Sequence, residues 1–193
     1  RRTSVTNALT QTTSSTYDAV GNLSSITDAL GRTTRYAYDG LDRVATRNGQ
    51  VFTYGGQSNE LVGDGTSTYS RGGNDQLLAV GQGDVERLTV NDRHGDLVAT
   101  LDPAGPMTAP ADTATFDPFG GVVGTTGAKR SIGFQGDWTD PDTGQVNMTA
   151  RWYDPGSGTF ASRDDHPLPG TPSGLANRYT YGLGSPLDHS DPS

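Results

Sequence analysis

The stretch that decides the fold runs from Thr16 to Gln50 and reads TYDAVGNLSSITDALGRTTRYAYDGLDRVATRNGQ. Its pair Tyr17-Asp18 returns 21 residues further on as Tyr38-Asp39. A fixed period of about 20 residues is typical of stacked supersecondary units. Short alternating runs bounded by Asp and Gly predict antiparallel hairpins, because Asp bonds the backbone of a tight turn and Gly supplies positive φ. We therefore expect consecutive hairpins of one curling sheet, with turns at 18–22 and 39–42.

The same alternation places Tyr36 and Tyr38 on one face of their strand, since strand side chains have a period of two. Beyond this stretch the period loosens, and the next tyrosines of the series are Tyr54 and Tyr69. The repeat excludes a helix longer than two turns within 1–83. An ordinary antiparallel meander, in which the tyrosines are merely good strand formers, remains an alternative on periodicity alone.

Composition narrows the class of protein further. The 193 residues include 14 Lys and Arg against 22 Asp and Glu, a formal charge of −8, which repels phosphate backbones and makes a nucleic-acid partner unexpected. With 27 Gly, 11 Pro and 31% hydrophobic residues, the chain suits many short strands better than a helical bundle. No apolar run approaches the ~18 residues of a membrane span. The absence of Cys removes disulfides and thiolate metal sites together.

Further blocks follow the repeats in a fixed order, and they give the sequence its strongest resemblance. They are NDRHGDLVATLD at 91–102, ATFDPFGGVVG at 114–124, IGFQGDWTDPDTGQVNMTARWYDPGSGTFASRD at 132–164 and NRYTYGLGSPLDHSDP at 177–192. The repeat resembles the YD repeat of bacterial RHS and teneurin-like proteins, and these blocks resemble the RHS-repeat-associated core domain. The resemblance covers nearly the whole chain and implies an all-β fold: YD-repeat hairpins at 1–90 and the core domain at 91–193.

Five Asp-Pro pairs punctuate the chain, at Asp102, Asp117, Asp140, Asp154 and Asp191. Because Pro fixes φ and removes a hydrogen-bond donor, we expect the first four pairs to end or turn strands. The large apolar residues between them are expected in the core, where truncating a Trp costs about 3–5 kcal/mol. These residues are Phe134, Trp138, Met148, Trp152, Tyr153 and Phe160.

The last part of the chain carries the candidate site. Two carboxylates held close together split their proton affinities, so that one serves as an acid and the other as a base. The resemblance to the RHS core, in which paired Asp residues are associated with self-cleavage, implies that Asp164 and Asp191 form such a dyad and that Arg163 holds one of them ionised. Asp165 stands where the family has Pro. A dyad also requires a strand at 177–187 to fold back inside the shell.

The resemblance implies a function as the closing segment of an RHS polymorphic toxin, an aspartyl-type autoprotease that releases an enclosed toxin. The partners would be its own C-terminal toxin segment, the remainder of the shell and a secretion or delivery component. The location would be secreted or at the cell surface. No cofactor or metal is expected, because His94, His166 and His189 are isolated and lack metal-ligand spacing. The alternatives are a cell-surface module that binds glycan or protein, marked by exposed aromatic rows, and a purely structural β scaffold.

At 21 residues per hairpin, the whole chain makes a ribbon only ~86 Å long, which closes into a tube of ~27 Å diameter. Side chains would fill most of such a tube. We therefore expect this chain to be the terminal part of a larger shell, with no room of its own for a folded toxin.

Overall fold

The computed structural model describes residues 1–163, 177–187 and 189. They form three antiparallel sheets in which every strand pairs with its neighbours in sequence. Helical structure in these residues consists of short 3₁₀ turns, and η1 (Gly73–Asp75) lies within the repeat region. The all-β ribbon expected from the repeat is confirmed. No helix among these residues has the length and apolar character needed to cross a bilayer.

The first sheet has six strands in the order in which they occur along the chain. They are β1 (Ser4–Thr6), β2 (Thr12–Tyr17), β3 (Leu23–Thr27), β4 (Thr33–Tyr38), β5 (Val44–Arg47) and β6 (Gln50–Val51). The turn after β2 closes with the Asp18 N–H donating to Asn22 O at 2.9 Å, and the turn after β4 closes in the same way between Asp39 and Arg43. Both predicted turns are confirmed, the second extending one residue further than expected.

The second sheet continues the ribbon with eight strands. They are β7 (Thr53–Tyr54), β8 (Leu61–Gly63), β9 (Ser67–Arg71), β10 (Leu77–Gln82), β11 (Val85–Asn91), β12 (Leu97–Leu101), β13 (Asp112–Phe116) and β14 (Val122–Thr126). The sheet runs without a break across residue 90, the boundary that the sequence analysis predicts between repeats and core blocks.

The ribbon curls because register shifts recur at equivalent places. A bulge precedes Tyr17, Tyr38 and Tyr54, each at the end of its strand. A bulge bends the strand that carries it and increases the local twist. Each of these tyrosines then pairs with a buried aliphatic residue at the start of the next strand, as Tyr17 does with Leu23 and Tyr38 with Val44.

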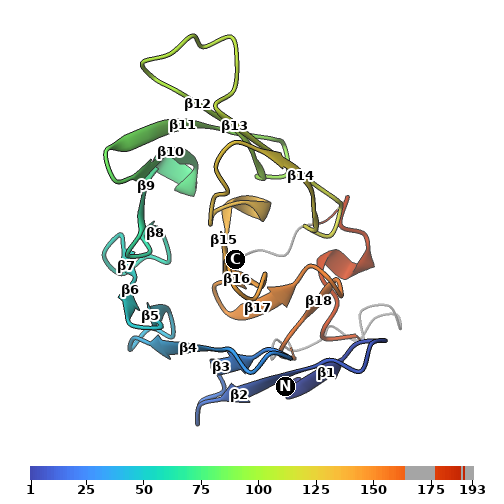
Figure 1. Cartoon of the computed structure of the whole chain (residues 1–193). Coiled ribbons are helices and arrows are strands. Elements are labelled where there is room, and N and C mark those ends of the chain that lie inside the picture. The colour runs from blue at the N-terminus through green and yellow to red at the C-terminus, as the bar shows by residue number, and fades with distance from the viewer. Residues whose placement is uncertain (164–176, 188, 190–193) are drawn as a thin grey trace.

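The third sheet lies inside the curl (Figure 1). Its strands are β15 (Trp138–Thr139), β16 (Val146–Met148), β17 (Arg151–Asp154) and β18 (Thr159–Phe160), and η2 (Phe134–Gly136) precedes it. We call residues 132–161 the plug. The ribbon passes around the plug from β1 at the bottom of the view to β14 at the upper right. The plug therefore occupies much of the inside of the curl, as the small expected diameter implies.

Two clusters of buried residues form the core. In the larger one, Trp138 and Trp152 of the plug join apolar residues of the ribbon such as Leu23, Val44 and Leu77. Tyr36 lies against the Trp152 ring at 4.6 Å, and the Tyr38 hydroxyl accepts a hydrogen bond from Trp152 Nε1 at 2.9 Å. The two tyrosines share a face, as predicted. All six large residues expected in the core are buried: Phe134, Trp138, Met148, Trp152, Tyr153 and Phe160.

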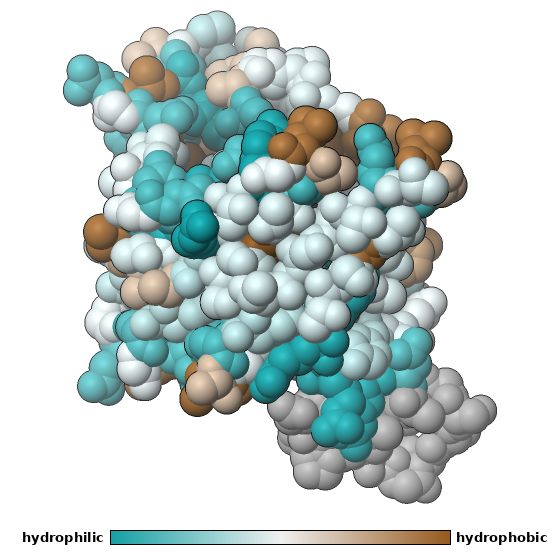
Figure 2. All heavy atoms as spheres, turned by 60° about the horizontal axis from the view of Figure 1, so that its bottom comes forward, coloured by the Kyte–Doolittle hydropathy of each residue, from teal (hydrophilic) through white to brown (hydrophobic). Residues whose placement is uncertain are grey.

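The outward face of the first sheet is polar. Figure 2 brings the bottom of Figure 1 forward and shows a mostly pale and teal surface, with brown residues at its margins. The strand β2 supplies a run of Thr and Ser to this sheet and contains one aromatic residue, Tyr17, which is half-buried. This one-sided burial is typical of an antiparallel sheet packed on a core.

Candidate functional site

The C-terminal segment joins the plug beside β18. The Phe160 N–H donates to Tyr179 O at 2.9 Å, and Thr180 forms a bridge with Thr159. The segment then turns through η4 (Gly182–Gly184) instead of continuing as the expected strand. Gly182 and Gly184 both have positive φ, at 53° and 78°, which a β-strand does not accommodate. The strand predicted over 177–187 is therefore wrong, because residues 178–179 form a turn and Thr180 makes only an isolated bridge.

Tyr181 fixes this segment to the plug, since its side chain is completely buried. Its ring lies 4.7 Å from that of Tyr153, 5.6 Å from that of Phe134 and 6.2 Å from that of Phe160, measured between centroids. The Tyr181 hydroxyl accepts a hydrogen bond from Gln135 Nε2. We call the buried set of Phe134, Val146, Met148, Tyr153, Phe160 and Tyr181 the aromatic platform.

The segment that precedes Asp164, on the other side of the predicted site, is also fixed by hydrogen bonds. The Ala161 N–H donates to Trp152 O at 2.8 Å, while Ala161 O accepts from the Arg2 N–H at 2.9 Å. The Tyr17 hydroxyl also reaches Ala161 O at 3.3 Å. The chain leaving β18 is thus attached to the first repeat, two residues before Arg163, which is exposed.

The predicted dyad itself lies outside the described residues. Asp164 and Asp191 both fall there, as do the neighbouring carboxylates Asp165 and Asp188. Their proximity and the role of Arg163 therefore remain predictions. The described structure shows only that the chain segments before both aspartates converge on the aromatic platform.

Of the three histidines, His94 and His189 belong to the described residues and His166 does not. His94 contacts Asp96 through Nδ1 at 3.1 Å, His189 is exposed, and His166 lies outside the described part of the chain. Within the described residues, no cluster of three or more His, Cys, Asp or Glu side chains is arranged to hold a metal ion.

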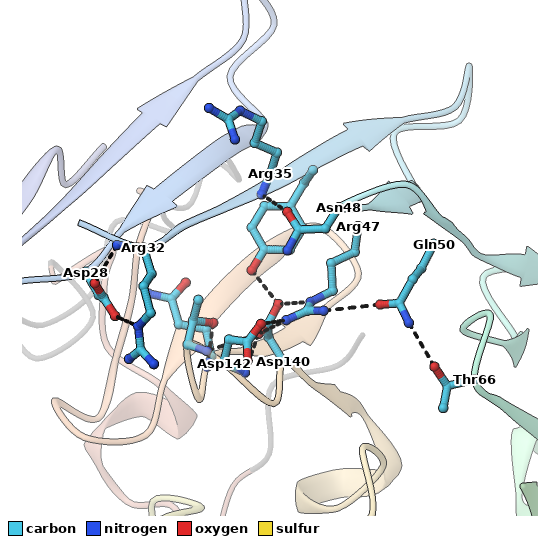
Figure 3. A network of polar contacts seen from close by, with 12 residues as sticks. Asp28, Arg32, Arg35, Arg47, Asn48, Gln50, Thr66, Asp140 and Asp142 are labelled. Carbon is cyan, nitrogen blue, oxygen red and sulfur yellow. Dashed lines mark hydrogen bonds and ion pairs between the residues drawn. The ribbon is translucent and has the colours of Figure 1, made fainter. Parts of the chain in front are cut away.

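Asp140 joins the plug to the ribbon through buried hydrogen bonds, whereas the sequence analysis expected only a turn at this Asp-Pro pair. Asp140 is fully buried, and its carboxylate accepts hydrogen bonds from Arg47 Nε at 2.7 Å and from the Tyr36 hydroxyl at 2.7 Å. Arg47 also pairs with Asp142, and Figure 3 shows the three charged side chains converging. Burial would raise the pKa of Asp140, but the bonds from Arg47 and Tyr36 outweigh it and hold that pKa below its ordinary value.

The repeat contains the signal that would have found Arg47. In the preceding repeat, 21 residues earlier, the equivalent position is Ile26, which is 3% exposed. Arg47 is 7% exposed and occupies the same inward position, so its charge needs a partner from the plug. A charged residue at an apolar position of a repeat therefore marks a contact with another layer.

A polar cavity of about 550 Å³ lies between the ribbon and the plug. Arg43, Glu60, Arg71 and Asn91 line it from the ribbon, and Asp137 lines it from the plug. Burial raises the pKa of the Asp137 carboxyl to about 7, an effect that nearby Arg71 opposes and Asp75 reinforces.

The chain is similar in sequence to known proteins. A family model of the RHS repeat matches residues 17–50. The tRNA3(Ser)-specific nuclease WapA of Bacillus spizizenii is 29% identical over 134 residues, which are 66% of this chain and 6% of that protein. The tRNA(Glu)-specific nuclease WapA of Bacillus subtilis subsp. natto is 32% identical over 106 residues, 51% of this chain and 4% of that protein.

The fold also matches solved structures. The crystal structure of TcdB2-TccC3 superimposes with a TM-score of 0.68 and 18% identity, covering 94% of this chain and 10% of that one. The crystal structure of TcdB2-TccC3-TEV gives a TM-score of 0.66 and 18% identity, with 93% and 10% covered. The chain therefore spans only a small fraction of the proteins that it matches.

A bulged antiparallel ribbon curled around an inner sheet defines the class of fold. Within that class, residues 17–50, from the end of β2 to the start of β6, match the RHS repeat, and the chain is similar to the named relatives over two thirds of its length or less.

Proposed function

We propose that this chain is the closing segment of an RHS toxin shell and that it cuts its own backbone just beyond Ser193. In this proposal 1–90 are the last YD-repeat hairpins and 91–193 are the core domain. The partners are the remainder of the shell and the toxin segment that follows, delivered by a secretion system to the cell surface or outside the cell. The fold and the matching relatives support a shell segment of this kind.

One observation carries the self-cleavage proposal: both chain segments that precede the aspartates lie on the aromatic platform. Asp164 is four residues beyond Phe160, within about 14 Å of extended chain. Asp191 is two residues beyond His189, whose N–H donates to Ser185 O at 3.0 Å. The rings of Phe160 and Tyr181 lie 6.2 Å apart, and Asp191 is ten residues beyond Tyr181, so both tethers leave from one place in the plug. This supports an encounter between the two carboxylates despite their distance in sequence.

The proposed chemistry is general acid–base hydrolysis of a peptide bond. The ionised carboxylate takes a proton from water as the water oxygen attacks the carbonyl carbon, and the protonated carboxyl donates to the leaving nitrogen. Arg163 keeps one aspartate ionised, while the like charge of that aspartate keeps the proton on the other. Asp164 and Asp191 take these two roles as a pair, and the reaction occurs once per chain.

The test uses a chain extended past Ser193 by the residues that its gene encodes. Wild type should give two bands on a denaturing gel, whereas Asp164→Asn and Asp191→Asn should each give one full-length band. Asp165→Asn and Asp188→Asn are matched controls, since each removes a neighbouring carboxylate, and both should still be cut. Circular dichroism and thermal melting confirm that each variant is folded. Cleavage in both dyad variants, or an uncut wild type, would refute the protease and leave a scaffold.

The alternative of a glycan-binding or protein-binding surface module predicts exposed rows of aromatic residues. All 15 aromatic residues of the chain are described, and Phe119 is the exposed one among them. The other fourteen are buried or half-buried in the curl. This distribution favours the closed-shell proposal.

A further inference from the structure

The polar cavity between ribbon and plug has its own chemistry, which does not depend on self-cleavage. Its walls come from both layers: β5 to β11 on the ribbon side and 135–138 with 147–149 on the plug side. Because residues of both layers form its walls, the cavity is complete only when the plug lies against the ribbon. At about 550 Å³ it is large enough for a side chain or a small molecule.

Three arginines of the ribbon line the cavity: Arg93 is exposed, and Arg43 and Arg71 already have partners within the protein. Arg71 donates to Leu61 O at 3.1 Å, to Asp75 Oδ1 at 3.0 Å and to Gly136 O at 3.3 Å. Arg43 is paired with Asp39 and lies over the Tyr54 ring at 4.4 Å. The guanidinium groups of Arg43 and Arg71 are therefore engaged within the protein.

Acceptors of the same wall have no partner. Asn91 Nδ2 donates to Leu77 O at 3.0 Å, but Asn91 Oδ1 is buried without a hydrogen bond. Within the described residues no hydrogen bond reaches the carboxyl of Asp137, although this half-buried group lines the cavity. The Asp137 carboxyl therefore has no donor within the described residues, and a ligand that donates a hydrogen bond to it is favoured.

We propose that this cavity binds an alkylammonium or guanidinium group, with the Asp137 carboxylate as its counter-ion and acceptor. Such cations carry several donors and no acceptor, which matches this carboxylate of the wall. The group is supplied by a free amine or amidine or by a Lys or Arg side chain of a polypeptide lying inside the curl. A metal ion fits less well, because the described residues hold no metal-binding cluster.

Binding should strengthen as pH rises, since only ionised Asp137 attracts a cation. Arg71 and Asp75 act on Asp137 most directly, and the other charged groups of the wall are Arg43, Glu60, Asp92 and Arg93. With the pKa of Asp137 at about 7, the ionised fraction rises about tenfold between pH 6 and pH 8. The affinity for a cation should rise by about the same factor.

The experiment is titration calorimetry and NMR of the intact chain with L-arginine amide and with a glycine-rich peptide that contains one arginine. The matched ligands replace arginine by citrulline, which has the same shape without the charge. Wild type should bind the arginine ligands, about tenfold more tightly at pH 8 than at pH 6, and the Asp137 carboxyl resonance should shift on binding. Binding of the peptide assigns a polypeptide source, and binding of the free amide alone assigns a small molecule.

Two variants separate the site from the surface charge. Asp137→Asn removes the counter-ion with little change in shape and should reduce affinity at pH 8 at least tenfold. Asp84→Asn removes an exposed carboxylate in the turn between β10 and β11 and should bind like wild type. The proposal is overturned if wild type fails to bind, if citrulline ligands bind equally well or if Asp137→Asn retains full affinity.

Discussion

Asp18, Asp28 and Asp39 occupy equivalent positions in three successive turns of the ribbon. The Oδ1 atom of each accepts backbone N–H groups two and four residues further on, as Asp28 does from Leu30 and Arg32 at 2.9 Å each. One side chain therefore closes each turn. The third residue after the aspartate has positive φ, at 111° for Gly21, 79° for Gly31 and 60° for Asp42.

This turn geometry predicts that replacing a glycine by alanine affects stability differently in two successive turns. Gly31→Ala should lower the free energy of unfolding by about 1 kcal/mol, because a Cβ at positive φ is strained. Gly40→Ala is the matched control, since a Cβ added at either position meets no atom within 4 Å and Gly40 lacks positive φ. It should be neutral or slightly stabilising. Equal urea midpoints for both variants would contradict the strain argument.

At the scale of elements, tyrosine hydroxyls tie successive strands together from inside the curl. Tyr17 donates to Arg2 O at 2.7 Å, Tyr38 to Leu23 O at 2.8 Å and Tyr54 to Val44 O at 2.9 Å. The three acceptors, residues 2, 23 and 44, are spaced by the same 21 residues as the repeat. The tyrosines therefore link specific strands through their hydroxyl groups. The alternative, in which they serve only as good strand formers, does not account for these bonds.

Tyr38 has a second partner, and this allows a comparison with Tyr54. Tyr38→Phe leaves both Leu23 O and Trp152 Nε1 without their hydrogen bond, whereas Tyr54→Phe leaves only Val44 O. An unsatisfied buried group costs about 1–3 kcal/mol, so Tyr38→Phe should destabilise more than Tyr54→Phe. Chemical denaturation of both variants measures the difference. A larger loss for Tyr54→Phe would mean that the Tyr38–Trp152 contact does not join the layers.

At the scale of the whole molecule, polar contacts fasten the plug to the ribbon along the curl. Their ribbon partners ascend in sequence while their plug partners descend, so the plug runs around the curl in the opposite sense. The contacts are Arg2–Asp154, Tyr38–Trp152, Arg47–Asp140, Asp64–Trp138 and Asp96–Gln135. Several of these carboxylates are buried, which couples closure of the molecule to pH.

Two groups of carboxylates should shape the dependence of stability on pH in opposite ways. For Asp64 and Asp140, hydrogen bonds overcome burial and keep the pKa below the ordinary value. Their stabilisation is present above about pH 4 and is lost as pH falls through the lower folded pKa. For Asp137 burial raises the pKa to about 7, so its favourable contribution is present below about pH 4 and is lost as pH rises through 7.

Asp137→Asn should therefore remove a decline in stability between about pH 4 and pH 7 and leave the acid limb below pH 4 unchanged. The measurement is the urea midpoint of wild type and variant from pH 3 to pH 8, compared as a difference curve. Asp84→Asn serves as the control for loss of one charge. A difference curve that is flat from pH 4 to pH 7 would show that the Asp137 carboxyl is not buried in solution.

The sequence by itself determined the hairpins, their turns and the inward face of the repeat, because all three follow from local spacing of Asp, Gly, Tyr and aliphatic residues. It also identified the large residues of the plug, since bulky apolar side chains have to be buried somewhere. It did not show that the plug lies inside the curl, that Arg47 and Asp140 pair across 93 residues or that the segment after Thr180 turns instead of extending. Those features depend on which distant surfaces meet when the ribbon closes. The buried charge of Arg47 acquires its partner only in the tertiary structure, where water has been excluded and a polar group needs a neighbour from another layer. The Asp137 carboxyl likewise comes to line a cavity only when the two layers meet.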